Sequence, residues 1–232
     1  MALIYGRAES EKELLDLYPK KVKKIEDIDR VHQELKDELK GDHKGFFGSV
    51  KKWNKQRQVN KFEKNKDDPF HAGASGEISV LKRLSELSDD YHIMCGLNFE
   101  LPKYVTYNGR KNLKSAQMDF VVVSNRGVIL IEVKNWSTQY YTQNNNLNPH
   151  EQVDRAGRVL WIALKSWRSP KNPPVTSVLL SIRENMNYNP NYKFVSVTDL
   201  NKINSFIEDR KEQFSDKEVQ RIVDRLKNHV TK

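Results

Sequence analysis

Three charged side chains in one apolar stretch have the types and the spacing to act on a phosphate or to hold a cation. Residues 117–136 read QMDFVVVSNRGVILIEVKNW, which is two apolar runs separated by a polar turn. If the turn centres on Asn125–Arg126, Asp119 lies opposite Glu132 on an antiparallel pair, where facing Cβ atoms are about 4.5–5.5 Å apart. Lys134 falls on the same face by strand alternation. The stretch therefore predicts a hairpin that carries two acids and a lysine at one end.

Two opposed carboxylates at the end of a buried hairpin repel each other and lose hydration, so something must compensate them. The compensation can be a shared proton, the ammonium group of Lys134, or a metal ion, and oxygen ligands of this kind suit Mg²⁺ or Mn²⁺. Spacing alone fits a salt-bridged cluster at a sheet edge equally well. The argument also requires a regular turn, because a slip of one residue reverses the face of Asp119.

Both faces of this hairpin are expected to be apolar. The face of the acids also carries Val121, Val123, Val128 and Leu130. The other face carries Met118, Phe120, Val122, Ile129, Ile131 and Val133. A hairpin with two apolar faces is typical of a sheet that is covered by helices on both sides.

The elements that must position these side chains form a mixed α/β pattern from residue 69 onward. In chain order we expect a helix within 73–91, a strand over 92–101, a lysine-rich loop over 102–115, strands over 117–123 and 128–134, a Tyr/Asn-rich loop over 138–149, a helix over 151–166, strands over 177–182 and 193–197, and C-terminal helices within 199–230. The last helix opens with Ser215 and Glu218 at capping-box spacing. This order predicts an α/β sheet covered by helices.

Residues 1–68 differ in composition and predict a basic helical arm before the main domain of 69–232. Residues 9–40 have amphipathic helical spacing interrupted at Pro19, and Gly41, Gly45 and Gly48 are expected to end the helix. The pair Asp67-Asp68 before Pro69 marks the expected boundary, since proline disfavours helix at the preceding residue.

The end of this arm is a candidate nucleic-acid contact. Residues 44–66 carry eight basic residues and a single acid, Glu63. Aromatic residues that could stack on bases are interleaved with them: Phe46, Phe47, Trp53 and Phe62. The residues predicted to touch nucleic acid are Lys51, Lys52, Trp53, Lys55 and Arg57. The alternative is a solvated linker whose aromatic side chains dock on the main domain.

Composition narrows the class of protein. The chain has 232 residues, a net charge of +9 and one cysteine, Cys95, which excludes an intrachain disulfide and a cysteine-based zinc site. No apolar run approaches the roughly 18 residues of a membrane span, and we expect a cytoplasmic protein. Neither histidine pairs with zinc-binding spacing nor a Gly-rich loop of the GxxxxGK[ST] type occurs in the sequence.

One ordered set of residues resembles a known family. Glu77 at a glycine-flanked helix start, Asp119 on one strand, Glu132-Val133-Lys134 on the next, and Asn148-Pro149 followed by Gln152 resemble the NERD (nuclease-related) domain. That domain is assigned to the PD-(D/E)xK nuclease superfamily. The resemblance covers roughly residues 73–185. It departs from the family pattern in a short 138–147 segment and in Thr138, where a glycine is often found.

The resemblance implies a restriction-endonuclease-like central mixed sheet flanked by helices, and metal-dependent hydrolysis of phosphodiester bonds. Mg²⁺, with Mn²⁺ as the substitute, would be held by Asp119, Glu132 and the carbonyl of Val133. Lys134 would orient a water molecule or stabilise the phosphate in the transition state. Glu77 would reach the metal directly or through water, although an acid also suits the first turn of a helix. Gln152 would fix a water or a phosphate, or it is an ordinary helix residue.

The implied substrate is DNA, and RNA stays open as the other polyanion of this kind. Lys103, Arg110, Lys111 and Lys114 lie just before Asp119 and could contact a phosphate near the metal, or they belong to a solvated loop. The alternative function is a non-catalytic nucleic-acid-binding or partner-docking module that keeps the nuclease fold. The N-terminal helix could also join the chain to itself or to a protein partner.

Overall fold

The computed structural model describes residues 1–24, 27–41, 46–66, 69–135, 148–166, 174–183 and 186–231. The chain divides into two compact units, residues 1–9 with 76–232 and residues 10–75. The division falls inside one continuous helix rather than before Pro69, and residues 1–9 join the sheet unit instead of the arm. Asp67 and Asp68, which mark the expected boundary, and the 138–147 segment with Thr138 lie outside the described residues.

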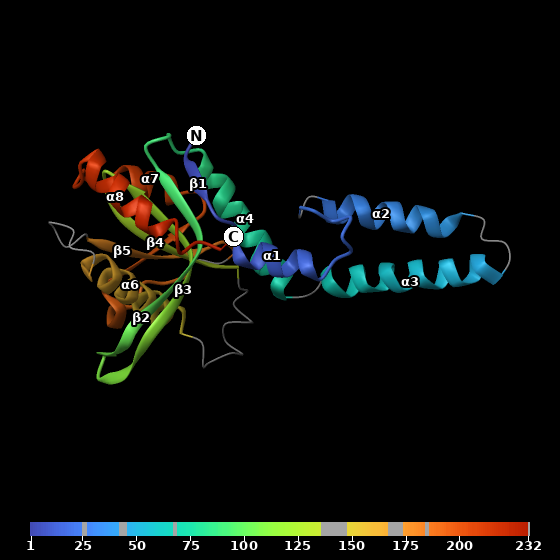
Figure 1. Ribbon diagram of the computed structural model, residues 1–232, viewed down its shortest axis with the longest axis horizontal. Coiled ribbons are helices and arrows are strands. Elements are labelled where there is room, and N and C mark those ends of the chain that lie inside the picture. The colour runs from blue at the N-terminus through green and yellow to red at the C-terminus, as the bar shows by residue number, and fades with distance from the viewer. Residues whose placement is uncertain are drawn as a thin grey trace. The chain divides into compact units, whose positions relative to one another are not determined.

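The elements follow the chain in the order drawn in Figure 1. They are β1 (Leu3–Tyr5), α1 (Glu9–Asp16), α2 (Asp27–Lys40), α3 (Phe46–Lys66), α4 (Pro69–Ser85), β2 (His92–Tyr107), β3 (Arg110–Ser124), β4 (Gly127–Lys134), α6 (Pro149–Ser166), β5 (Val175–Ser181), β6 (Val195–Asp199), α7 (Ile203–Glu208) and α8 (Asp216–Leu226). At the start of α8 the carboxylate of Glu218 accepts the backbone N–H of Ser215, so the expected cap is confirmed.

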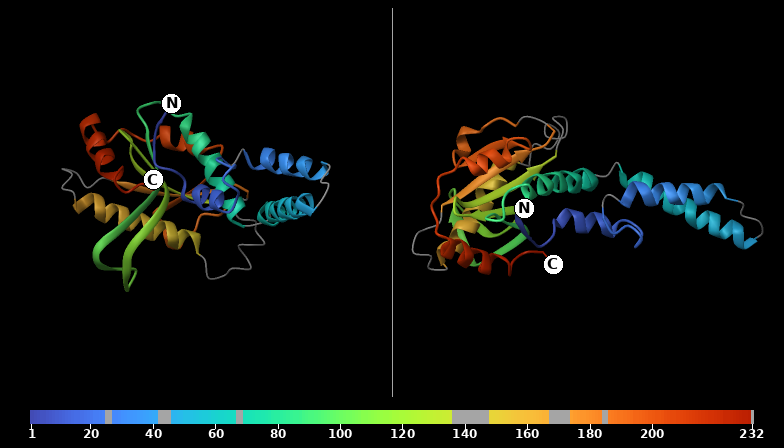
Figure 2. Two further views of the ribbon diagram at one scale, coloured as in Figure 1. Left: turned by 45° about the vertical axis from the view of Figure 1, so that its right-hand side comes forward. Right: turned by 90° about the horizontal axis from the view of Figure 1, so that it is seen from above.

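Within the described residues, six strands form one mixed sheet in the order β1-β2-β3-β4-β5-β6. The β2–β3 and β3–β4 pairs are antiparallel and the others are parallel. Helices α6 and α8 pack on one face and α4 and α7 on the other, each over its own apolar core (Figures 1 and 2). The predicted α/β fold, a mixed sheet flanked by helices, is confirmed. The parallel strand β1 was missed, because three residues are too few to show a periodic pattern.

The expected hairpin register is confirmed. Val123 pairs with Val128, and the ladder continues to Phe120 and Ile131, one pair before Asp119 and Glu132. Val121, Val123, Val128 and Leu130 lie in the core beneath α6 and α8. Phe120, Val122, Ile129, Ile131 and Val133 lie in the core beneath α4 and α7.

Met118 lies on the opposite face to the one predicted. It packs in the core of Val121, and its partner Leu97 does the same. The neighbouring pair, Cys95 and Phe120, lies in the other core, so the alternation of faces breaks between the two pairs. Gly96, which lies between Cys95 and Leu97, adopts a φ of +59°. A side chain at Gly96 would meet the carbonyl of Arg7 at 2.8 Å, so only glycine fits this turn of the backbone.

The expected loop over 102–115 is wrong, because β2 and β3 continue through it as a two-stranded ribbon. Its turn is Asn108-Gly109, both with positive φ (49° and 75°), which is a strong hairpin signal that the lysine content obscured. Only one face of the ribbon is apolar, with Phe99, Leu101 and Leu113 buried against the core that includes α6. Charged residues on the other face need no burial, so they do not prevent a strand.

The unit of residues 10–75 has its own core. Val59 and Phe62 of α3 are buried among Leu14, Tyr18 and residues of α2. Phe62 thus docks inside the arm, where it stacks on His32 at a ring distance of 5.3 Å. The apolar face of α2 is covered by its own chain.

Two of the expected helix breaks can be compared with the structure. Helix α2 ends at Lys40, directly before Gly41, as expected. Gly48 does not end a helix, because it lies within α3. The packing of Val59 and Phe62 of that helix outweighs the loss of about 1 kcal/mol in helix stability that a glycine causes. Gly45 lies outside the described residues.

The close packing of α6 on β5 gives a stability prediction. A Cβ at Gly157 would lie 2.1 Å from Ser177 Oγ, so Gly157→Ala should force the helix off the sheet. We expect a loss of about 1–3 kcal/mol in the free energy of unfolding, measured by denaturant titration. Gly73→Ala in α4 is the matched control, because no described atom outside the neighbouring backbone of its own helix lies within 4 Å of that Cβ, and alanine should stabilise the helix by about 0.5–1 kcal/mol. Equal effects of the two substitutions would contradict the packing argument.

Candidate active site

The end of the β3–β4 hairpin gathers the predicted acids and the lysine. Asp119 Oδ2 accepts the backbone N–H of Val133 at 2.7 Å, directly beyond the last ladder pair. Glu132 is 3% exposed, and its Oε1 accepts a hydrogen bond from Lys134 Nζ at 2.9 Å. Strand β5, which pairs with Glu132 and Lys134 on the other side, holds this end of β4 inside the sheet.

Helix α4 adds the third acid, Glu77. A side chain at Gly76 would lie 2.9 Å from Ile182 Cδ1 and 3.0 Å from Asn135 Cβ, so glycine lets the helix approach the end of β4. This approach brings the charge of Glu77 close enough to act on Asp119. Sequence reasoning missed Gly76 and Asn135 as positioning residues, although the small residues before Glu77 were a visible signal.

The pKa of Asp119 responds to its burial and to the two neighbouring acids. Burial of its carboxyl group raises the pKa of Asp119 well above its ordinary value, and the negative charges of Glu132 and Glu77 raise it further. Lys134 and the N–H of Val133 act in the opposite direction without cancelling the rise. In the protein without metal, two effects thus reduce the repulsion between the acids. One is the tendency of Asp119 to bind a proton, and the other is the ion pair of Lys134 with Glu132.

The donor set fits a divalent cation. If all three acids ionise, Lys134 balances one of them and two negative charges remain. Glu132 Oε2 is buried and has no hydrogen-bond partner among the described residues, which is costly unless a cation or a water molecule binds to it. Among the residues that the structure describes, no three His, Cys, Asp or Glu side chains converge as a metal cage. A bound Mg²⁺ would therefore keep waters or take a backbone oxygen besides Asp119 and Glu132.

Gln152 is not brought together with these four residues by any hydrogen bond or ion pair within the described part of the chain. It is exposed near the start of α6, and its backbone N–H donates to the carbonyl of Asn148 at 3.1 Å. The same helix start is fixed by the Asn148 side chain, which accepts the backbone N–H of His150 at 3.1 Å. The role of Gln152 at the site stays a prediction.

The comparison with known families found a match, which covers this part of the chain. Residues 72–182 match the model described as the nuclease-related domain, NERD. These residues form a NERD domain. It extends from α4 to the end of β5 and so includes Glu77, Asp119, Glu132 and Lys134. No curated protein sequence matches the chain. Among the described helices, none combines the length and the apolar character needed to cross a membrane.

The basic candidates of the NERD domain lie along the β2–β3 ribbon. Arg110 is 3.9 Å from Glu151 of α6 and is still 72% exposed. Lys114 pairs with Glu100 at 2.5 Å and lies over the ring of Tyr104. Lys111 is exposed and pairs with Thr106 in the ladder.

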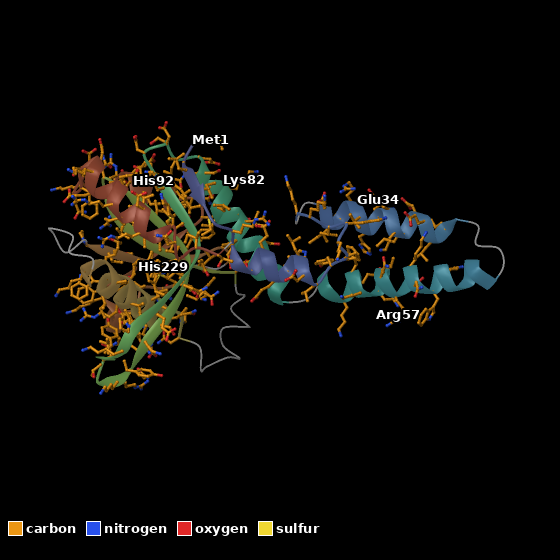
Figure 3. The ribbon with its side chains drawn as sticks, in the orientation of Figure 1. Met1, Glu34, Arg57, Lys82, His92 and His229 are labelled. Carbon is orange, nitrogen blue, oxygen red and sulfur yellow. The ribbon has the colours of Figure 1, made fainter. Side chains whose placement is uncertain are left out.

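Outside the NERD domain, the basic candidates of α3 divide between two sides of the helix. Lys55 pairs with Glu38 of α2 at 2.7 Å, so it ties the two helices together. Arg57 lies on the side of α3 that faces away from α2 (Figure 3). Its guanidinium group is 4.8 Å from the ring centre of Trp53, which is 59% exposed. Lys52 is exposed, and the side chain of Lys51 is outside the described ones.

The raised pKa of Asp119 predicts how stability depends on pH. The pKa of Asp119 in the folded protein lies above the unfolded value of about 3.9, so the folded state binds the proton more tightly than the unfolded state does. The free energy of unfolding therefore falls as the pH rises from the unfolded pKa to the folded pKa. In EDTA, Asp119→Asn should therefore have a higher Tm than the wild type, by a margin that grows from pH 4 to pH 7.

Asp89→Asn, at an exposed position, is the matched control and should show no such margin. Added Mg²⁺ should raise the Tm of the wild type more than that of Asp119→Asn. A margin that does not change with pH would contradict the assigned crowding.

Proposed function

We propose that this protein is a metal-dependent nuclease that hydrolyses phosphodiester bonds of DNA. The observation that carries the proposal is the Lys134–Glu132 ion pair beside Asp119, whose pKa the charges of Glu132 and Glu77 raise, together with a buried Glu132 oxygen that has no hydrogen-bond partner among the described residues. A protein that served only as a scaffold would gain nothing from this cost. The cluster lies in a nuclease-related domain, which supports phosphodiester chemistry over other uses of a divalent cation.

Asp119, Glu132 and the carbonyl of Val133 would hold Mg²⁺, and Mn²⁺ fits the same oxygen donors. When bound, the metal supplies polarisation of the scissile phosphate and a lower pKa for a water molecule. The N–H of Val133 fixes the carboxylate of Asp119 in place, through a 2.7 Å hydrogen bond. Asp119 therefore needs no side-chain rearrangement to present its other oxygen.

Lys134 and Glu77 act on the substrate side of the cluster. The ammonium group of Lys134 is held by Glu132 and can donate a second hydrogen bond to a phosphate oxygen as its charge grows. Glu77 would accept a hydrogen bond from a water molecule and orient it for attack. The amide of Gln152 would orient a water or a phosphate oxygen at the rim.

Replacement of Glu132 tests the proposed chemistry. Glu132→Gln keeps the size of the side chain and removes the charge, so we expect cleavage of duplex DNA in Mg²⁺ to fall by about 10²–10³-fold, in line with the loss of one essential electrostatic group. DNA affinity in EDTA should be unchanged or higher, since a negative charge is lost. Cleavage is measured on linear and circular, single-stranded and double-stranded DNA, and binding by fluorescence anisotropy.

Glu86→Gln, at an exposed position of the same domain, is the matched control. Metal-dependent cleavage that survives in Glu132→Gln would overturn the assigned role. No cleavage by the wild type, together with no Mg²⁺ binding, would favour the alternative of a non-catalytic binding or docking module.

The basic side of α3 is proposed as a nucleic-acid contact. Joint replacement of Lys52 and Arg57 by Gln should weaken binding to DNA and lower the slope of log K against log salt by about 1.8, because each neutralised phosphate contributes about 0.9 to that slope. Lys36→Gln is the control, because Lys36 pairs with Glu63 at 3.0 Å inside the arm. An unchanged slope in the double variant would remove this segment from the nucleic-acid interface.

A further inference from the structure

The long hairpin of β2 and β3 extends away from the site as a two-stranded ribbon. Strand β1 pairs with β2 from His92 to Met94, and Leu97 forms a bridge with Val230 near the C-terminus. Beyond that point, within the described part of the chain, the strand pairs join 98–107 only to 110–117. The ribbon (residues 98–117) can be followed in Figure 1 from the sheet to its turn.

The two faces of the ribbon have different chemistry. Its inner face is apolar and packs with α6 in one core, through residues such as Phe99 and Leu113. Its outer face is polar and exposed, and it carries Thr106 opposite Lys111, with Tyr104 exposed nearby. Ribbon residues include four basic side chains and one acid, Glu100, which is already paired with Lys114. The ribbon as a whole therefore has an excess of three positive charges, four basic residues less one acid, which is complementary to a polyanion.

The turn of the ribbon is fastened to α6. Tyr107 Oη donates to Asp154 Oδ2 at 2.8 Å, and Asp154 is 8% exposed. Arg155 of α6 donates to Asn112 Oδ1 at 3.1 Å and to its carbonyl at 3.2 Å. The pKa of Tyr107 is raised to about 12 by burial and by this bond to Asp154, so the phenol stays a donor throughout the neutral range. A ribbon held in this way presents its outer face without an ordering cost on binding.

Strand β3 sets the distance between the ribbon and the acids. Lys111 precedes Asp119 by eight residues of continuous strand, which is about 26 Å at about 3.3 Å per residue. That length corresponds to about 8 base pairs of B-DNA at 3.4 Å per base pair. The major groove of B-DNA is about 12 Å wide and admits a two-stranded ribbon, whereas the major groove of an RNA duplex is too narrow for side chains to read.

We propose that the outer face of the ribbon binds the groove of duplex DNA, with Lys103 and Lys111 on the backbone about 8 base pairs from the phosphate at the acidic cluster. This inference rests on the proposed function and adds to it the substrate class, double-stranded DNA, and the side of the cut on which the substrate must extend. Single-stranded DNA has no groove and would not keep this spacing, since it is flexible over the same length.

Binding without metal tests the ribbon independently of cleavage. The double variant Lys103→Gln/Lys111→Gln should bind a 30-base-pair duplex in EDTA with an affinity several-fold lower than the wild type, and with a salt slope smaller by about 1.8. Its affinity for single-stranded DNA of the same length should change less. Lys217→Gln in α8 is the matched control at an exposed position. Equal losses on the single strand, or none on the duplex, would overturn the proposal.

A tethered probe measures the spacing. Cys95 is fully buried, so an iron-chelate reagent can be attached selectively to Lys111→Cys in the full chain. Radical cleavage of the duplex should centre about 8 base pairs from the cut that the protein makes in Mg²⁺. Radical cleavage scattered along the duplex, or directly at the protein's own cut, would overturn the assigned geometry. Loss of duplex binding in the double variant with no cut by the wild type would support the ribbon and refute the nuclease.

Discussion

The interaction on which this structure depends is the placement of two strand carboxylates, Asp119 and Glu132, beside one ammonium group, with a third acid near enough to act on Asp119. Glu132 is almost fully buried, Asp119 is desolvated, and Glu77 adds its field from a separate helix. Lys134 neutralises one of the three through its hydrogen bond to Glu132. A fold that keeps such an arrangement without a bound cation must tolerate the cost, and the raised pKa of Asp119 shows how part of it is relieved.

The surrounding elements make this confinement unavoidable. Strand β4 is paired with β5 at Glu132, and the Asp119 side chain accepts the next backbone N–H on its other side, so this end of the strand is held inside the sheet. Helix α4 can approach only because Gly76 has no side chain, and that contact fixes how far Glu77 lies from the strands. Both apolar cores, one beneath α6 and α8 and one beneath α4 and α7, hold these pieces in place. The energy for the unfavourable cluster therefore comes from packing elsewhere in the domain.

The sequence was sufficient for the hairpin and its register, because the short polar turn centred on Asn125–Arg126 between two apolar runs sets which residues pair. It was not sufficient for Met118, since its face depends on a positive φ at Gly96, a residue on another strand. Nor did it predict the ribbon, because charged residues on a one-sided strand resemble a loop until the apolar partner, α6, is known. The grouping of Glu77 with the hairpin came from family resemblance. A helix face alone does not say which strand end it meets.

Strand β3 carries one of the three acids, Asp119, and also forms one side of the basic ribbon. An acidic centre repels a polyanion, so a phosphodiester substrate needs attraction from outside the centre before any metal can act on it. Strand β3 supplies both parts, with Asp119 in the sheet and Lys111 and Arg110 at the far end of the ribbon. Because the strand is continuous and its turn is fastened to α6, the separation of the two charges is fixed by backbone geometry. The basic ribbon is thereby kept at a constant distance from the acids, which is the arrangement that the proposed action on DNA requires.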